Sequence, residues 1–74
     1  MNARLNQIFQ IIRANPNLTE REICDRAGIK KTPYSRQLLL TLISEGSIAR
    51  FEDPSALRLT YRYCIQETNE LPLD

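Results

Sequence analysis

The chain has 74 residues, of which 42% are hydrophobic and 26% charged, and its formal net charge is +1 at pH 7. This size fits one small domain, and the composition is ordinary for a globular protein, which argues against disorder and fibrous repeats. The sequence contains no histidine, no apolar run near the ~20 residues of a membrane span, and no signal-peptide pattern. We therefore expect no enzymatic activity, no catalytic residues, no metal site, no cofactor and no membrane partner.

The first predicted element is a helix over residues 4–14. Its apolar residues recur at spacings of three and four, which places them on one stripe. The stripe consists of Leu5, Ile8, Phe9 and Ile12. Ile11 lies beside it, where it would widen the core face or contact a partner. The breakers Asn15-Pro16-Asn17 end this helix.

A second, shorter helix is predicted over residues 20–27. Thr19 precedes it and Glu22 follows three residues later, which is the spacing of a capping box. Gly28 fits the left-handed position that ends a helix. These signals are local and define both ends of the element.

The third predicted helix covers residues 33–45. Thr32 is a good N-cap and Pro33 suits the first helical position, where its missing N–H costs nothing. Gly46 marks the end. Two helices joined by a short turn that contains glycine form the helix-turn-helix arrangement.

Projection of this helix separates an apolar side from a polar side. Tyr34 falls on the apolar side, so we expect it to pack, and Ser35 lies at its centre, where a small residue allows a close approach to a neighbouring helix. Leu40 projects outward. The polar side carries Arg36 and Gln37 near the N-terminus of the helix.

The segments 47–51 and 57–65 alternate between apolar and polar residues and predict two strands, with a turn over 52–56. The resulting β-hairpin carries Arg50, Arg58 and Arg62. Residues 66–74 show no period and are expected to form a flexible acidic tail.

Charge is divided unevenly along the chain. Residues 1–62 hold all ten basic residues and six acids, whereas 63–74 hold three acids and no base. The mildly basic body is a weak indication of a polyanionic partner. The two cysteines, Cys24 and Cys64, are too few for a disulfide scaffold, so we expect buried thiols in a reducing cytoplasm rather than a bridge.

The order helix, helix, turn, helix, strand, turn, strand predicts a mainly α domain with a small β-hairpin, an α+β fold over residues 1–65. The segment LTEREICDRAGIKKTPYSRQLLLTLISEGSIAR resembles the winged helix-turn-helix family of DNA-binding domains. The resemblance rests on T-x-x-E-I-C opening the second helix, a glycine in the turn, L-x-x-L-x-x-x-G-x-I closing the third helix, and a two-stranded wing. The turn is one residue longer than the commonest form, and the net charge is lower than in many members.

The resemblance implies that the helix over 33–45 enters the major groove of double-stranded DNA. Arg36 and Gln37 would then read base edges, because arginine suits guanine and glutamine suits adenine. The residues expected to contact phosphates near the helix N-terminus are Lys30, Lys31, Thr32 and Ser35. Those expected on the wing, at phosphates or an adjacent minor groove, are Arg50, Arg58 and Arg62. For each of these side chains the alternative is ordinary solvation of the surface.

The sequence therefore favours a small cytoplasmic transcriptional regulator that binds a specific DNA sequence and has no small-molecule ligand. One module offers little area to DNA, so a homodimer is expected, with Ile11, Leu71 and Leu73 as candidate contacts. The alternative is a winged-helix protein–protein interaction module in a larger complex, which the near-neutral charge, the acidic tail and Leu40 favour.

Overall fold

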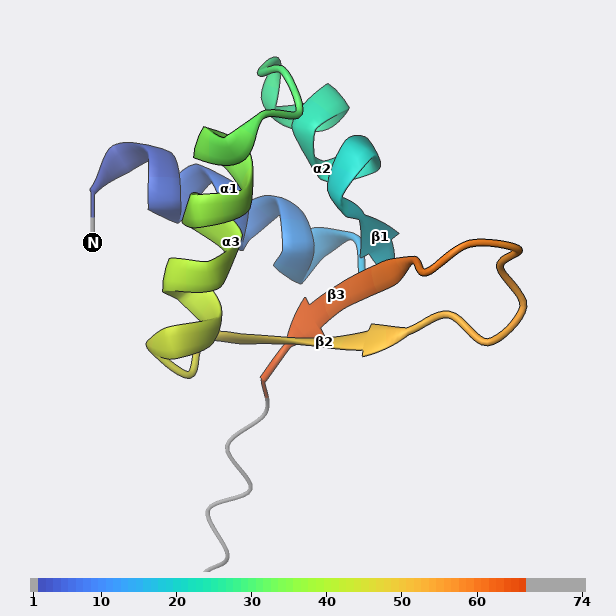
Figure 1. Cartoon of the computed structure of the whole chain (residues 1–74). Helices are drawn as coiled ribbons and strands as arrows, with labels where there is room; N and C mark the ends of the chain where they lie inside the picture. The colour runs from blue at the N-terminus through green and yellow to red at the C-terminus, as the bar shows by residue number, and fades with distance from the viewer. Residues whose placement is uncertain (1, 67–74) are drawn as a thin grey trace, which may run out of the picture.

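Three helices cover one side of a small sheet in a computed structural model that describes residues 2–66 (Figure 1). The elements in chain order are α1 (Ala3–Ala14), β1 (Leu18–Thr19), α2 (Glu20–Ala27), α3 (Pro33–Ser44), β2 (Ile48–Glu52) and β3 (Tyr61–Ile65). The mainly α fold with a hairpin is confirmed. No helix among the described residues is long and apolar enough to cross a membrane. The tail predicted for 66–74 lies, from residue 67 onward, outside the described residues.

The helix ends follow the local signals in the sequence. At the start of α2 the Thr19 Oγ accepts a hydrogen bond from Glu22 N at 3.3 Å, and the Thr19 N donates to Glu22 Oε1 at 2.9 Å. This is the predicted capping box. The bond from the Thr19 backbone also lowers the pKa of the Glu22 carboxyl. Gly28 ends the helix at φ 71°, a left-handed conformation that glycine adopts without strain.

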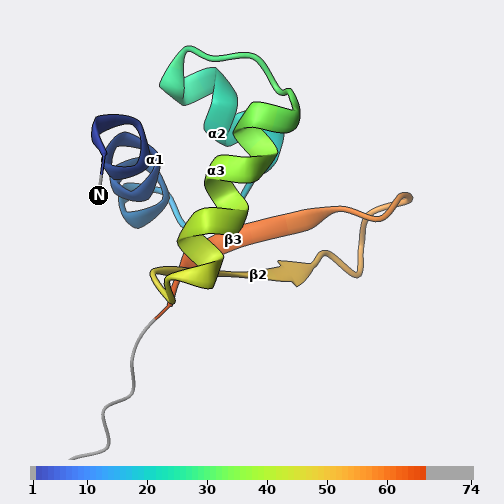
Figure 2. The same cartoon turned by 60° about the vertical axis from the view of Figure 1, so that its left-hand side comes forward.

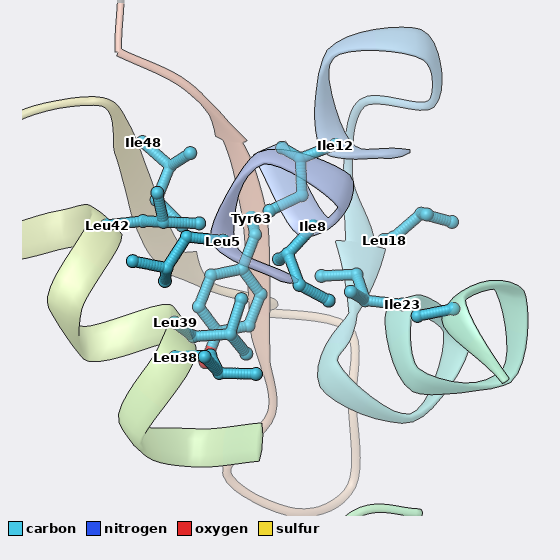
Figure 3. Close-up of a cluster of buried hydrophobic side chains, with 11 residues drawn as sticks. Leu5, Ile8, Ile12, Leu18, Ile23, Leu38, Leu39, Leu42, Ile48 and Tyr63 are labelled. Carbon is cyan, nitrogen blue, oxygen red and sulfur yellow. The ribbon is translucent and has the colours of Figure 1, made fainter. Parts of the chain in front are cut away.

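The core lies where α1, α3 and β3 meet (Figure 3). The predicted stripe of α1 faces inward and packs against leucines of α3 and the ring of Tyr63 from β3. Phe9 and Ile11 are partly buried against the same cluster. Ile11 thus widens the core face, one of its two predicted roles. The fully buried residues with the largest side chains are Ile8, Ile12, Ile23, Leu39, Leu42 and Ile48.

The sheet has three strands rather than the predicted two. Its order is β1-β3-β2, with both pairs antiparallel, and Leu18 and Thr19 of β1 pair with Tyr63 and Arg62 of β3. The predicted element order therefore missed β1. A two-residue strand is too short to show a period, and its pairing depends on a segment more than forty residues away.

The second hairpin strand is shorter than predicted. It starts at Tyr61 instead of residue 57, and Leu57 and Leu59 are exposed to solvent. The Asp53 N donates to Thr60 O at 2.8 Å and closes the hairpin there. Residues 53–60 form the wing loop, which extends away from the helices (Figure 2). Arg58 consequently lies in this loop and not on a strand.

The two thiols differ. Cys24 is buried in α2, as predicted, whereas Cys64 on β3 is half-buried, so the expectation of two buried thiols is wrong for Cys64. Both are free, in agreement with the prediction that they form no bridge. Cys64 loses its cover because β3 has one face toward the core and one toward the outside, and its neighbour Tyr63 takes the inner position.

Candidate nucleic-acid interface

Most of the predicted contact residues lie on the surface formed by the loop before α3, the N-terminal half of α3 and the wing. This surface faces away from the core, and α3 and the wing border it together (Figure 2). The exposed members are Lys30, Lys31, Thr32, Arg36, Gln37, Arg50 and Arg58. Arg62 is half-buried and Ser35 is buried.

Ser35 belongs to the interior. The residue is 2% exposed, and its Oγ lies 2.9 Å from Glu20 Oε2 and 2.8 Å from Thr32 O. Because a hydroxyl has one hydrogen, we assign it to the carboxylate, which is the stronger acceptor. Thr32 N donates to the same Oγ at 2.9 Å and helps to start α3. The expected contact between Ser35 and a phosphate is therefore corrected: the hydroxyl joins α3 to α2.

Arg36 is held by the same carboxylate. Its Nε donates to Glu20 Oε1 at 2.9 Å, while 55% of the arginine side chain and only 8% of the glutamate side chain are exposed. The hydrogen bond and the charge of Glu20 raise the pKa of the guanidinium. Within residues 2–66 neither terminal nitrogen of Arg36 donates a hydrogen bond to the protein. Arg36 is thus anchored at one atom and open at its tip.

Arg62 is engaged at the base of the wing instead. Its Nε donates to Asp53 Oδ2 at 2.8 Å and its Nη1 donates to the Asn17 backbone oxygen at 2.8 Å. The Glu22 carboxylate lies 3.7 Å from Nη1. Hydrogen bonds from Ser55 and from Arg62 lower the pKa of Asp53 to about 2. These contacts join the wing to the segment between α1 and α2.

A groove of about 380 Å³ separates the start of α2 from the wing. Four cations line it and one carboxylate, Glu20, lies at its wall. The cations are Arg21, Lys31, Arg36 and Arg50. The guanidinium carbon of Arg50 lies 4.0 Å from the centre of the Tyr61 ring, a cation–π contact that holds the arginine against the wing. The groove is therefore a positive surface bounded by aromatic side chains.

Three features of this surface escaped the sequence analysis. The sequence predicted no role for Glu20, yet the buried carboxylate of this residue binds both Ser35 and Arg36. Arg21 lines the groove and was not among the predicted contacts. Tyr34, expected to pack, is 58% exposed, because it lies in the first turn of α3 where no element covers it. Leu40 is exposed, as predicted.

Among residues 2–66 no group of three or more potential metal-ligating side chains comes together. The predicted absence of a small-molecule ligand stays a prediction.

No protein-family model matches the sequence, and no curated protein matches it. The fold is nevertheless similar to solved structures. The PcaV transcriptional regulator from Streptomyces coelicolor, solved in complex with its natural ligand, superposes with a TM-score of 0.79 at 17% identity over 88% of this chain and 45% of that one. Transcriptional regulator PA4135 gives 0.77 at 17% identity, covering 88% of this chain and 46% of that one. Transcriptional regulator SlyA gives 0.75 at 18% identity, covering 90% and 45%.

These similarities show that the chain has the winged-helix fold of the solved transcriptional regulators, with α2 and α3 as the helix-turn-helix and β2–β3 as the wing. The chain spans less than half the length of the structures it matches.

Proposed function

We propose that this protein binds double-stranded DNA at specific sequences and regulates transcription in the cytoplasm, with α3 in the major groove and the wing on the backbone. The observation that supports this most is the exposure of Arg36 and Gln37 side by side at the start of α3, flanked by Lys30, Lys31 and the wing arginines. On a winged-helix fold this is the part of the molecule that a duplex approaches.

The two exposed side chains of α3 have complementary chemistry for base edges. The terminal nitrogens of Arg36 suit O6 and N7 of guanine, and the amide of Gln37 suits N6 and N7 of adenine. The Gln37 Nε2 lies 3.5 Å from Thr41 Oγ1, which is a long contact that a base could replace. Base recognition by two adjacent residues would give a short half-site.

Phosphate contacts would come from both sides of α3. Lys30, Lys31 and Thr32 precede the helix, where its N-terminal dipole also favours an anion. Arg50 and Arg58 are exposed on the wing. These contacts fix position and give the affinity its dependence on salt, while the bases supply the specificity.

We also propose that two copies bind adjacent half-sites, because one module of this size covers ~600–1,000 Å² of DNA contact. Of the candidate dimer contacts, Ile11 packs against the core, and Leu71 and Leu73 lie outside the described residues. A sedimentation experiment tests the dimer: one chain per particle in the free protein, together with one chain per duplex in the complex with cognate DNA, would contradict it.

A protein–protein interaction module is the second candidate. Tyr34 and Leu40 on α3, and Phe51, Leu57 and Leu59 on or beside the wing, are exposed large apolar side chains. Such a surface would bind a protein partner with little dependence on salt, whereas DNA binding loses affinity steeply as salt rises.

Fluorescence anisotropy of a labelled mixed-sequence duplex separates the two functions. We expect the affinity to fall at least tenfold between ~50 and ~200 mM salt, as counterion release requires. Lys31→Ala should weaken binding, while Arg26→Ala serves as the charge-matched control, since Arg26 lies on α2 beside Glu22 and Asp25, outside the groove. No binding at the lower salt would overturn the proposed function.

A further inference from the structure

Glu20 is the only charged side chain among the described residues that is buried, with 7% of the residue exposed. It lies at the wall of the positive groove, on the side that the proposed function assigns to DNA. A carboxylate there repels phosphates, and burying it requires partners for both oxygens. A carboxylate in this position is unfavourable for DNA binding unless it contributes to the site in another way.

The partners of Glu20 are two consecutive residues of α3. Oε2 accepts from the buried Ser35 hydroxyl at 2.9 Å, and Oε1 accepts from Arg36 Nε at 2.9 Å. Because the Ser35 hydroxyl holds the carboxylate against α3, the second bond also holds the guanidinium relative to that helix. Only 8% of the Glu20 side chain is exposed, so water competes less for this carboxylate than for that of a surface ion pair.

Glu20 binds Arg36 at Nε and not at a terminal nitrogen, and this choice determines which donors stay available. Binding at Nε leaves the two terminal amino groups of Arg36 without a protein partner among residues 2–66, and the side chain remains 55% exposed. Guanine is read by a pair of parallel N–H donors, which the terminal groups supply. An arginine held in this way has already lost much of its rotamer freedom before it meets a base.

We propose that Glu20 is a positioning residue for Arg36, orienting its terminal amino groups toward a guanine in the major groove without contacting DNA itself. This inference rests on the proposed function. It makes the preference for guanine at one base depend on a buried carboxylate of the preceding helix, with Ser35 as the link that holds the carboxylate.

The proposal predicts two effects of opposite sign for Glu20→Gln. Removing a negative charge beside the duplex favours phosphate binding, so affinity for mixed-sequence DNA stays constant or rises. Loosening Arg36 lowers the discrimination for guanine. A purely structural joint between α2 and α3 would change thermal stability and leave the discrimination ratio unchanged at temperatures where the variant is folded.

The test measures the ratio of dissociation constants for a duplex enriched by selection and for the same duplex with 7-deazaguanine, which lacks N7, at the recognised guanine. We expect a wild-type ratio of about tenfold, within the range of one bidentate base contact. Glu20→Gln and Ser35→Ala should each reduce it to less than about threefold. Glu22→Gln is the matched control: it removes a charge from the same helix while glutamine keeps the capping box, and it should retain the wild-type ratio.

A measurement on the DNA-free protein keeps the proposal open to contradiction even if a variant fails to fold. In wild-type protein the Arg36 Nε–Hε signal should be resolved by NMR and exchange slowly with water, unlike that of the exposed Arg58. A rapidly exchanging Arg36 signal would overturn the anchor. If the protein binds DNA with a salt-dependent affinity and a guanine motif that Glu20→Gln leaves intact, this inference fails and the proposed function stands; if it binds no DNA, both fail.

Discussion

Two arginine–carboxylate pairs in the molecule use the guanidinium differently. In the pair of Arg36 and Glu20, the carboxylate is buried and the arginine donates only its Nε. In the pair of Arg62 and Asp53, the arginine donates from Nε and also from Nη1, the latter to the Asn17 backbone. Among residues 2–66, the terminal nitrogens of Arg36 therefore remain available to a ligand, whereas Arg62 uses both Nε and Nη1 to bind the protein.

The positive charge of a side chain therefore says little about whether its donors are available to a ligand. Arg36 and Arg62 were both predicted to contact DNA, and both form ion pairs of 2.8–2.9 Å. What distinguishes them is the number of donors already satisfied. We therefore expect Arg36 to determine DNA specificity and Arg62 to determine the attachment of the wing.

The largest expected effect concerns DNA affinity in the two arginine variants. Arg36→Ala should weaken binding to the selected duplex by about 5- to 150-fold, the value of one bidentate base contact. Arg62→Ala should weaken it by less than about threefold, the scale of a peripheral charge. Anisotropy titrations of both variants on one duplex make the comparison. Equal losses would break the distinction between the two pairs.

Thermal stability should depend on Arg62 and not on Arg58. Arg62→Ala removes the link between the wing and the chain before β1, so we expect the Tm to fall by a few degrees. Arg58→Ala, in the exposed wing loop, should leave the Tm unchanged. Differential scanning calorimetry provides both values, and a Tm for Arg62→Ala equal to that of wild type would show that the wing needs no such attachment.

Acid should loosen the Arg62 pair. The pKa of Asp53 is lowered from 3.8 to about 2 in the folded protein, so its contribution to stability is present above pH ~4 and is lost as the pH falls through about 2. Urea unfolding at pH 5 and at pH 2.5 should show this decrease. Asp53→Asn should show a smaller decrease, with the remainder due in part to Glu22, whose pKa is also lowered. An identical decrease in the variant would show that protonation of Asp53 does not cause the loss of stability.

The smallest expected effect concerns Arg50, which resembles neither pair because it lies over the Tyr61 ring. If it contacts one phosphate, Arg50→Gln should reduce the slope of log affinity against log salt by about 1 and leave the base preference unchanged. Titrations at four salt concentrations measure the slope. A changed base preference would mean that Arg50 reads DNA directly.

The helices could be predicted from the sequence because their signals are local. The capping box at Thr19, the glycine at position 28 and the Thr32-Pro33 start each act within four residues. The strand β1 and the true start of β3 depend on pairing between distant segments, so periodicity placed the latter four residues too early. Leu57 and Leu59 continue the alternating pattern, but they precede the strand and are exposed to solvent.

The sequence predicted which charged residues lie at the candidate site, but not the hydrogen bonds and ion pairs that join them. The small Ser35 at the centre of the apolar side correctly indicated a close approach of α3 to a neighbour. Which atom would face its hydroxyl depends on the packing of α2, so the buried carboxylate of Glu20 had no signal of its own. The availability of Arg36 and the engagement of Arg62 followed from that packing.

We propose that α3 reads bases through Arg36 and Gln37. Selection from a pool of random duplexes tests it most directly when wild type, Arg36→Ala and Gln37→Ala are carried through the same rounds. We expect one wild-type motif, from which Arg36→Ala loses a guanine and Gln37→Ala loses an adenine at a neighbouring position. A wild-type pool without a motif, or variants that enrich the wild-type motif unchanged, would contradict it.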